Sequence, residues 1–304
     1  MKLGFSWRVL VFIAPALLIY ATFSALPLID TLRLGLYSAD DTGARSFAGL
    51  ANYITILSDP QWSASFWNAM GNNLKFFCIH MAVQNPVGLL LAALLSLRNV
   101  RFAATYRTVF FLPTLLSVVI IGFVWQLILS PLWGVSERLL SFVGLGDWFA
   151  PWLGLESSAL TTVSLMSVWQ YIGVPMMLIY AALIAIPEDI IEAAVVEGAS
   201  PWRIFWQIRL PLILPTLGLV TILTFVANFN AFDLIYTVKG AVAGPNYSTD
   251  ILGTLFYRTF FGYQSQVASP TMGAAVATIM FLVILVGVAV YFLAVQRKLQ
   301  RFAL

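Results

Sequence analysis

Six long stretches without Asp, Glu, Lys or Arg constrain this sequence more than any other feature. They cover residues 9–29, 76–97, 108–136, 157–187, 210–232 and 271–296. A helix rises 1.5 Å per residue, so about 20 residues cross the roughly 30 Å hydrocarbon core of a bilayer. The sequence therefore predicts an all-α polytopic membrane protein with six transmembrane helices. Pro131 and Pro187 are expected to end two of the longer stretches, since proline opposes helix continuation.

The composition excludes the main soluble classes. Hydrophobic residues make up 61% of the 304 residues and charged residues 10%, whereas soluble domains have about 45–50% and about 25%. Such a surface must meet lipid, which excludes a soluble enzyme, a disordered chain and a fibrous protein. The single cysteine, Cys78, and the single histidine, His80, exclude a disulfide framework and a Cys or His metal cluster within the chain. The Lys and Arg residues form no basic stripe, so no nucleic-acid partner is expected.

The distribution of charge predicts the orientation. The first stretch follows a basic start, but its apolar run is longer than the 7–15 residues of a secretory signal, so we expect a retained span. Segments 1–8, 98–107, 188–209 and 297–304 hold ten of the sixteen Lys and Arg and four of the thirteen acids. By the positive-inside rule, these segments and both termini face the cytoplasm.

The sequence lacks an energy source and a catalytic arrangement of its own. None of its four lysines is followed by Ser or Thr, as a phosphate-binding loop requires. Proton coupling usually needs ionisable groups deep in the spans, and His80 lies near one end of its stretch. His80 could act as a base or proton relay, but a packing role beside a neighbouring helix near the headgroups is favoured. Either the chain is passive or a partner supplies the energy, and we expect no catalytic residue.

The cytoplasmic segment 188–211 predicts a short helix-turn-helix. Acids follow Pro187, as at a helix N-terminus, and Gly198 suits a helix end or a close contact. Ser200 then caps a second helix that has Pro201 at its first position and continues to Pro211. Small and apolar residues share one stripe of the first helix beside two acids; they are Ile191, Ala194, Val195 and Gly198, with Glu192 and Glu197. This face suits insertion into a groove of a partner protein.

The same segment carries a resemblance to a known family. The string Glu192-Ala193-Ala194-x3-Gly198-x9-Ile208-x-Leu210-Pro211 is similar to the EAA loop of permease subunits of binding-protein-dependent ABC importers. Residues 47–53, 228–236 and 257–259 make the chain resemble the carbohydrate-uptake branch, of the maltose and glycerol-3-phosphate permease type. Glu197 stands where many relatives have Asp, and 239–245 has fewer glycines than many relatives.

The resemblance implies a type I ABC importer permease fold and a set of partners. These are a second homologous permease, a dimer of ATPase subunits that bind ATP and Mg, and a periplasmic or lipoprotein solute-binding protein. No cofactor is expected on this chain. The implied location is the cytoplasmic (inner) membrane of a bacterium or archaeon. The ATPase-coupling residues would be Glu192, Ala193, Ala194, Glu197, Gly198, Ile208 and Pro211.

We expect residues 1–70 to form an N-terminal span with an outer loop. Residues 71–297 would form the core permease domain, which includes the coupling loop, and residues 298–304 a cytoplasmic tail.

Two polar clusters within the spans are candidates for the substrate pathway. A sugar needs amide or hydroxyl partners and aromatic platforms, and the candidates are Ser167, Gln170, Tyr171, Thr224, Asn228, Asn230 and Asp233. By resemblance, Thr224, Asn228 and Ser167 match positions that contact sugar in the maltose-type permease. The alternative is that Thr and Asn join helices by hydrogen bonds. Alternative functions are a self-sufficient secondary transporter or channel, and a membrane enzyme that acts on lipids.

Overall fold

The computed structural model describes residues 7–40, 43–97, 100–264 and 266–296. The contacts divide the chain into two compact units, Met1–Phe66 with Leu255–Phe281, and Trp67–Thr254 with Leu282–Leu304. The predicted division at residues 70 and 297 follows membrane topology rather than compactness and stays a prediction. The predicted tail, 298–304, lies outside the described residues.

The first unit contains the N-terminal helix and a small β-hairpin. Its elements are α1 (Trp7–Tyr20), the π turn η1 (Ala21–Ala25), α2 (Leu26–Leu34), β1 (Tyr37–Ala39), β2 (Arg45–Phe47) and α3 (Ala51–Ser58). The strands pair antiparallel, with Tyr37 opposite Phe47. Asn52 is buried and its amide donates to the carbonyls of Gly35 (2.9 Å) and Tyr37 (2.8 Å). This side chain therefore ties α3 to the end of α2 and the start of the hairpin.

The second unit contains most of the helices. They are α4 (Pro60–Ile79), the π turn η2 (His80–Gln84), α5 (Asn85–Leu95), α6 (Ala103–Phe111), the 3-10 turn η3 (Leu112–Leu115), α7 (Val118–Leu129), α8 (Val135–Phe142), η4 (Gly146–Trp148), α9 (Glu156–Tyr171), α10 (Gly173–Ile184), α11 (Glu188–Val196), α12 (Pro201–Ile204), the π turn η5 (Phe205–Arg209), α13 (Leu210–Leu212), α14 (Leu214–Phe229) and α15 (Asp233–Lys239). Three elements have residues in both units: α4, α16 (Leu252–Phe261) and α17 (Pro270–Val290), which is followed by the π turn η6 (Tyr291–Gln296).

The described helices agree with six spans if each bent pair crosses once. Three helices are long and apolar enough alone, over Val11–Leu34, Pro60–Leu95 and Pro270–Ala294. Three further pairs qualify together but are bent, α6–η3 with α7 by 97°, α9 with α10 by 43°, and α12–α13 with α14 by 64°. Prolines contribute to these breaks, because a proline cannot donate to the carbonyl one turn earlier; Pro113 lies just before the first break, and Pro175 and Pro215 lie just after the other two.

Two predicted boundaries need correction. The second span was expected to begin at residue 76, but its helix begins at Pro60 and continues through the π turn to Leu95. The fifth was expected to begin at residue 210, but its helices begin at Pro201 and the chain bends at Ile213, before α14. Charge-free stretches identify the lipid-compatible part of a helix, and a helix can extend beyond that part.

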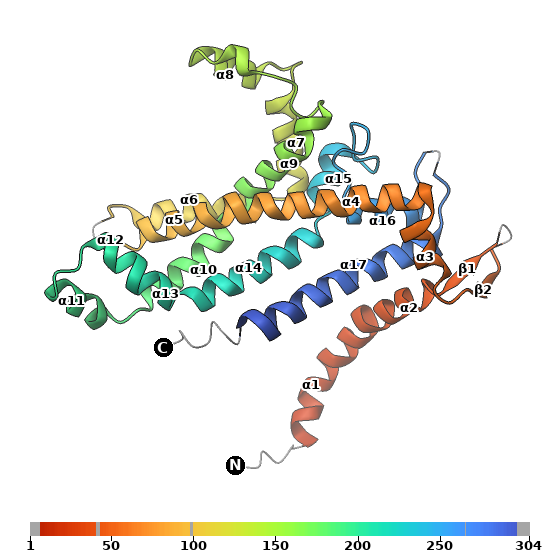
Figure 1. The fold of residues 1–304 in the computed structure, drawn as a ribbon, viewed down its shortest axis with the longest axis horizontal. Coiled ribbons are helices and arrows are strands. Elements are labelled where there is room, and N and C mark those ends of the chain that lie inside the picture. The colour runs from red at the N-terminus through yellow and green to blue at the C-terminus, as the bar shows by residue number, and fades with distance from the viewer. Residues whose placement is uncertain (1–6, 41–42, 98–99, 265, 297–304) are drawn as a thin grey trace. The chain divides into compact units, whose positions relative to one another are not determined.

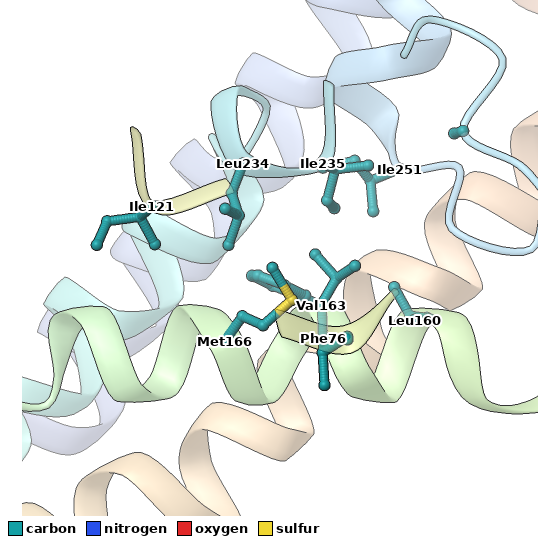
Figure 2. Packing of buried hydrophobic residues seen from close by; sticks show 10 residues of the cluster. Phe76, Ile121, Leu160, Val163, Met166, Leu234, Ile235 and Ile251 are labelled. Carbon is teal, nitrogen blue, oxygen red and sulfur yellow. The ribbon is translucent and has the colours of Figure 1, made fainter. Parts of the chain in front are cut away.

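Two apolar clusters hold the second unit together. In one, α10 packs against α5 and α14, with Ala92, Met176, Ile179 and Ile213 almost fully buried. The other joins α4, α7, α9 and α15. Figure 2 shows Val163 and Met166 of α9 pointing toward Leu234 and Ile235 of α15.

Within the second unit, the helix-turn-helix segment 188–211 and α15 lie at opposite ends of the helices. Figure 1 shows α11 and α12 at one end of α10 and α14, and α15 beyond the other end of α14. The two regions that the sequence singles out, 188–211 and the polar end of α14, are therefore separated along the helix axes.

Candidate functional site

The helix α14 carries a row of polar side chains on an otherwise apolar surface. Thr224 and Asn228 are one turn apart, and both are buried. The Thr224 hydroxyl donates to the Val220 carbonyl (2.8 Å) and contacts Oδ1 of Asn85 on α5 (3.2 Å). The Asn228 amide donates to the Thr224 carbonyl (2.7 Å). Oδ1 of Asn228 remains buried without a hydrogen-bond partner among the described residues, which is unusual for a native polar group.

A cavity of about 440 Å³ lies beside this row. Its volume falls within the range of about 300–1,000 Å³ that small-molecule sites occupy. Apolar side chains supply much of its wall, among them Phe76, Leu178 and Ile235. A small set of polar groups among apolar ones is the usual composition of a binding site for a small solute.

Six of the seven predicted pathway residues line this cavity. They come from α9 and from the segment 224–233, and they are Ser167, Tyr171, Thr224, Asn228, Asn230 and Asp233. These two segments are far apart in the sequence, so the fold brings the two predicted clusters together.

Gln170 is the exception, and its predicted place on the pathway stays a prediction. It does not line the cavity. Its fully buried side-chain amide donates to the Leu116 carbonyl (3.3 Å), and its main-chain carbonyl accepts from the Thr114 hydroxyl (2.9 Å). Successive residues of a helix point about 100° apart, so Gln170 is turned toward the bend before α7 while Tyr171 faces the cavity.

His80 also lines the cavity, which the sequence did not indicate. It is buried in the π turn η2, well inside the helix that begins at Pro60, and its expected place near the headgroups stays a prediction. Its Nδ1 lies 2.8 Å from the Phe76 carbonyl and its Nε2 lies 3.0 Å from Oγ of Ser167. The expected packing against a neighbouring helix is confirmed, since this contact joins η2 to α9.

Gln84 is a cavity residue that the sequence reasoning missed. It ends the π turn, is 6% exposed, and its Oε1 has no hydrogen-bond partner among the described residues. An uncharged polar residue inside an apolar stretch was the available signal. Since π turns inside helices often occur at functional sites, the turn 80–84 strengthens the assignment of this cavity.

The second candidate region is the surface hairpin 188–211, and its predicted turn geometry is confirmed. Gly198 has a φ of +80°. Its N–H donates to the Val195 carbonyl and the N–H of Ala199 donates to the Ala194 carbonyl, both at 2.9 Å. This is the Schellman arrangement that ends many helices. Ser200 then caps α12 by accepting from the Arg203 N–H (3.3 Å).

The hairpin presents apolar and acidic residues at its surface. Val195 is 58% exposed, Val196 is 88% exposed and Trp202 is 72% exposed, whereas Ala194 is buried. Of the other predicted coupling residues, Glu192, Ala193, Glu197 and Gly198 are exposed, and Ile208 and Pro211 are half-buried. Exposed large apolar residues beside acids on a well-ordered turn are typical of a docking surface.

The hairpin and all cavity-lining residues except Phe76 and His80 fall within one family match. Residues 84–300 match the family described as binding-protein-dependent transport system inner membrane component. The chain belongs to this family. This inner membrane component is also 31% identical, over 85% of its length and 88% of the relative's, to the probable ABC transporter permease protein YurN of Bacillus subtilis.

Another relative and a solved structure extend the comparison. The probable starch degradation products transport system permease protein AmyD of Thermoanaerobacterium thermosulfurigenes is 29% identical, with 95% of this chain and 94% of the relative covered. The fold matches a crystal structure of a bacterial ABC transporter involved in the import of the acidic polysaccharide alginate. The TM-score is 0.77 at 20% identity, over 97% of this chain and 96% of the other. The inner membrane component therefore has the fold of an ABC importer permease, as predicted.

Proposed function

We propose that this chain is a permease subunit through which a sugar or sugar derivative, delivered by a solute-binding protein, crosses the membrane. The observation that carries the proposal is the cavity, where uncharged hydrogen-bonding groups of α9 and α14 face an apolar wall. A sugar offers hydroxyl groups and apolar ring faces, which match such a wall. The relative named for starch degradation products supports carbohydrate as the class of cargo.

In this proposal, the polar residues of the cavity hold the sugar during passage. Ser167, Thr224, Asn228 and Asn230 would hydrogen-bond to its hydroxyls, Tyr171 would offer a ring face, and Asp233 would lie at the outer edge. Amides and hydroxyls suit this place because a charged side chain at the centre of a membrane helix costs about 2.5–3.5 kcal/mol on insertion scales. Gln170 would act indirectly, by holding the bend before α7 against α9.

The hairpin 188–211 is the proposed contact with the ATPase subunits. Its exposed residues Glu192, Ala193, Glu197 and Gly198 would enter the ATPase cleft, where Glu192 would pair with a basic residue. Ala194, Ile208 and Pro211 would hold the hairpin against the spans. Closure of the ATPase dimer on ATP would move the hairpin, and the spans would change from inward-open to outward-open. ATP thereby stabilises one of two states of the same helix bundle.

The complete transporter would contain further chains. They are a second homologous permease, two ATPase subunits that bind ATP and Mg, and a periplasmic or lipoprotein solute-binding protein. This chain would be non-catalytic, would hold no cofactor, and would have both termini in the cytoplasm of a bacterium or archaeon, as the excess of Lys and Arg on that side supports.

Reconstitution tests the proposal directly. The chain would be purified with its co-expressed neighbours, placed in liposomes, and assayed for uptake of labelled sugars with and without ATP. We expect an ATPase and a second permease to co-purify, and uptake to require ATP, the ATPase and the binding protein. Uptake by this chain alone without ATP would overturn the proposal and favour a secondary transporter or channel.

A further inference from the structure

The hydrogen bonds in the wall of the cavity run mainly in one direction. Asn228 donates to the Thr224 carbonyl (2.7 Å), Asn230 donates to the Val226 carbonyl (3.0 Å) and Thr224 donates to the Val220 carbonyl (2.8 Å). Each of these side chains thus gives a hydrogen to its own helix and keeps its oxygen as an acceptor, and each of the two asparagines also keeps a second amide hydrogen. The end of α14 therefore offers the cavity several oxygen acceptors.

In the contact between His80 and Ser167, a cavity side chain again uses its hydrogen within the protein. A carbonyl oxygen only accepts, so the contact of Nδ1 with the Phe76 carbonyl (2.8 Å) places a hydrogen on Nδ1. In the neutral imidazole, Nε2 is then an acceptor, and the Ser167 hydroxyl, 3.0 Å away, must donate to it. Ser167 therefore also uses its hydrogen within the protein and retains its oxygen for other partners.

Two acceptor oxygens on side chains that line the cavity are buried and have no hydrogen-bond partner among the described residues. Oδ1 of Asn228 and Oε1 of Gln84 have no hydrogen-bond partner among the described residues, and the two side chains are 4% and 6% exposed. Both residues line the cavity. A buried acceptor without a partner is unfavourable, and a ligand that brings hydrogen-bond donors removes that cost.

The charge of the wall has one sign. Asp233 lines the cavity, and no Lys or Arg is among the described residues that line it. Lys239, on the same short helix α15, donates instead to the Leu153 carbonyl, and neither residue lines the cavity. The cavity therefore has a carboxylate and no cationic side chain to balance an anion.

From the acceptor-rich wall and the lone carboxylate we infer that this cavity selects neutral, polyhydroxylated ligands and excludes anionic sugars such as uronates and sugar phosphates. The inference rests on the proposed function. A neutral sugar can supply hydroxyl hydrogens to the acceptor oxygens of this wall. An anionic group would lose water, meet acceptors and a carboxylate, and find no counter-charge.

The first experiment compares matched neutral and anionic probes. The purified transporter complex would be placed in nanodiscs without its solute-binding protein, so that selection by that protein cannot contribute. Equilibrium dialysis would measure binding of maltose and methyl glucoside, and of methyl glucuronide and glucose 1-phosphate. We expect at least one neutral probe to bind about tenfold or more tightly than both anions, a preference that weakens as salt screens the carboxylate.

The second experiment removes the charge. Asp233→Asn should raise glucuronide binding about three- to tenfold relative to binding of the neutral probes, because it removes repulsion and keeps an acceptor oxygen. Asp147→Asn is the matched control, since Asp147 is exposed on η4 and does not line the cavity. It should leave the preference between neutral and anionic probes as in the wild type.

The outcomes separate the two proposals. Equal or tighter binding of the anionic probes to the wild-type complex, or an unchanged preference in Asp233→Asn, would overturn the inference and leave the proposed sugar site standing. Binding of no probe at all would contradict the sugar site itself, and the inference would fall with it.

Discussion

Replacing Gly198 by alanine tests whether the turn of the hairpin 188–211 is needed for coupling. Gly198 has a φ of +80°, and a Cβ atom added there would meet no other group within 4 Å. The substitution therefore adds no clash, and its cost comes from the backbone alone. A non-glycine residue in the left-handed region costs about 1–2 kcal/mol. This lowers the population of the native turn relative to its alternatives by a factor of about 5–30.

The chain offers a matched control at Gly144. This glycine has a φ of +78° and the same open space around a Cβ atom. It also ends a helix, α8, in a Schellman arrangement. The Gly144 N–H donates to the Ser141 carbonyl (3.1 Å), and the Leu145 N–H donates to the Leu140 carbonyl (2.8 Å). Gly144→Ala therefore imposes a similar backbone strain at a place away from the hairpin. Gly198→Asn is an intermediate variant, because asparagine tolerates the left-handed region better than alanine.

The assay is co-purification of the ATPase subunits, combined with transport-coupled ATP hydrolysis by the reconstituted complex. We expect Gly198→Ala to reduce both about fivefold or more, from the strain in the turn, with Gly198→Asn between it and the wild type. Gly144→Ala should match the wild type in both assays. If Gly198→Ala keeps full docking and coupling, or if Gly144→Ala reduces them equally, the turn has no specific role in coupling.

Three further predictions address the cavity, the hairpin and the packing of the spans. Asn228→Leu should reduce uptake about tenfold, because one buried hydrogen bond to the sugar is lost, while the subunits still assemble; normal uptake kinetics would remove Asn228 from the pathway. Glu192→Lys should weaken co-purification of the ATPase by reversing the charge offered to its cleft, and unchanged recovery would count against that contact. Gly173→Ala should lower stability by about 1–3 kcal/mol through overpacking, since its Cβ would lie 2.7 Å from Cα of Phe111; an unchanged Tm in detergent would contradict this close approach.

Local features of the sequence were sufficient to predict the apolar spans and the turn of the hairpin 188–211. The six charge-free stretches predict the spans because lipid excludes charge over a length that the bilayer sets. Gly198 and Ser200 mark the turn because a left-handed backbone and an N-cap are requirements of single residues. Such properties depend on neighbours within about one helical turn, so they can be derived without the fold.

The partners of buried polar groups could be determined only by the tertiary structure. Asn73 is fully buried; its amide donates to the Asn228 carbonyl (3.0 Å) and its Oδ1 accepts from Leu252 N–H (2.7 Å). These residues are far apart in sequence, and nothing local to Asn73 indicates them. Likewise Gln170 and Tyr171 are adjacent, yet only the packing of α9 decides which of them faces the cavity.

The sequence alone thus determined the charge-free stretches of six candidate spans and the turn of the hairpin 188–211, while the coupling role of that hairpin and the polar residues of a sugar pathway stay predictions. The tertiary structure decided that Ser167 and Asn228 share one cavity, that His80 and Gln84 join them, and in which direction their hydrogen bonds run. The physical reason is that span formation follows from how each segment partitions between water and lipid. A binding site instead depends on side-chain directions that are set when several helices pack together.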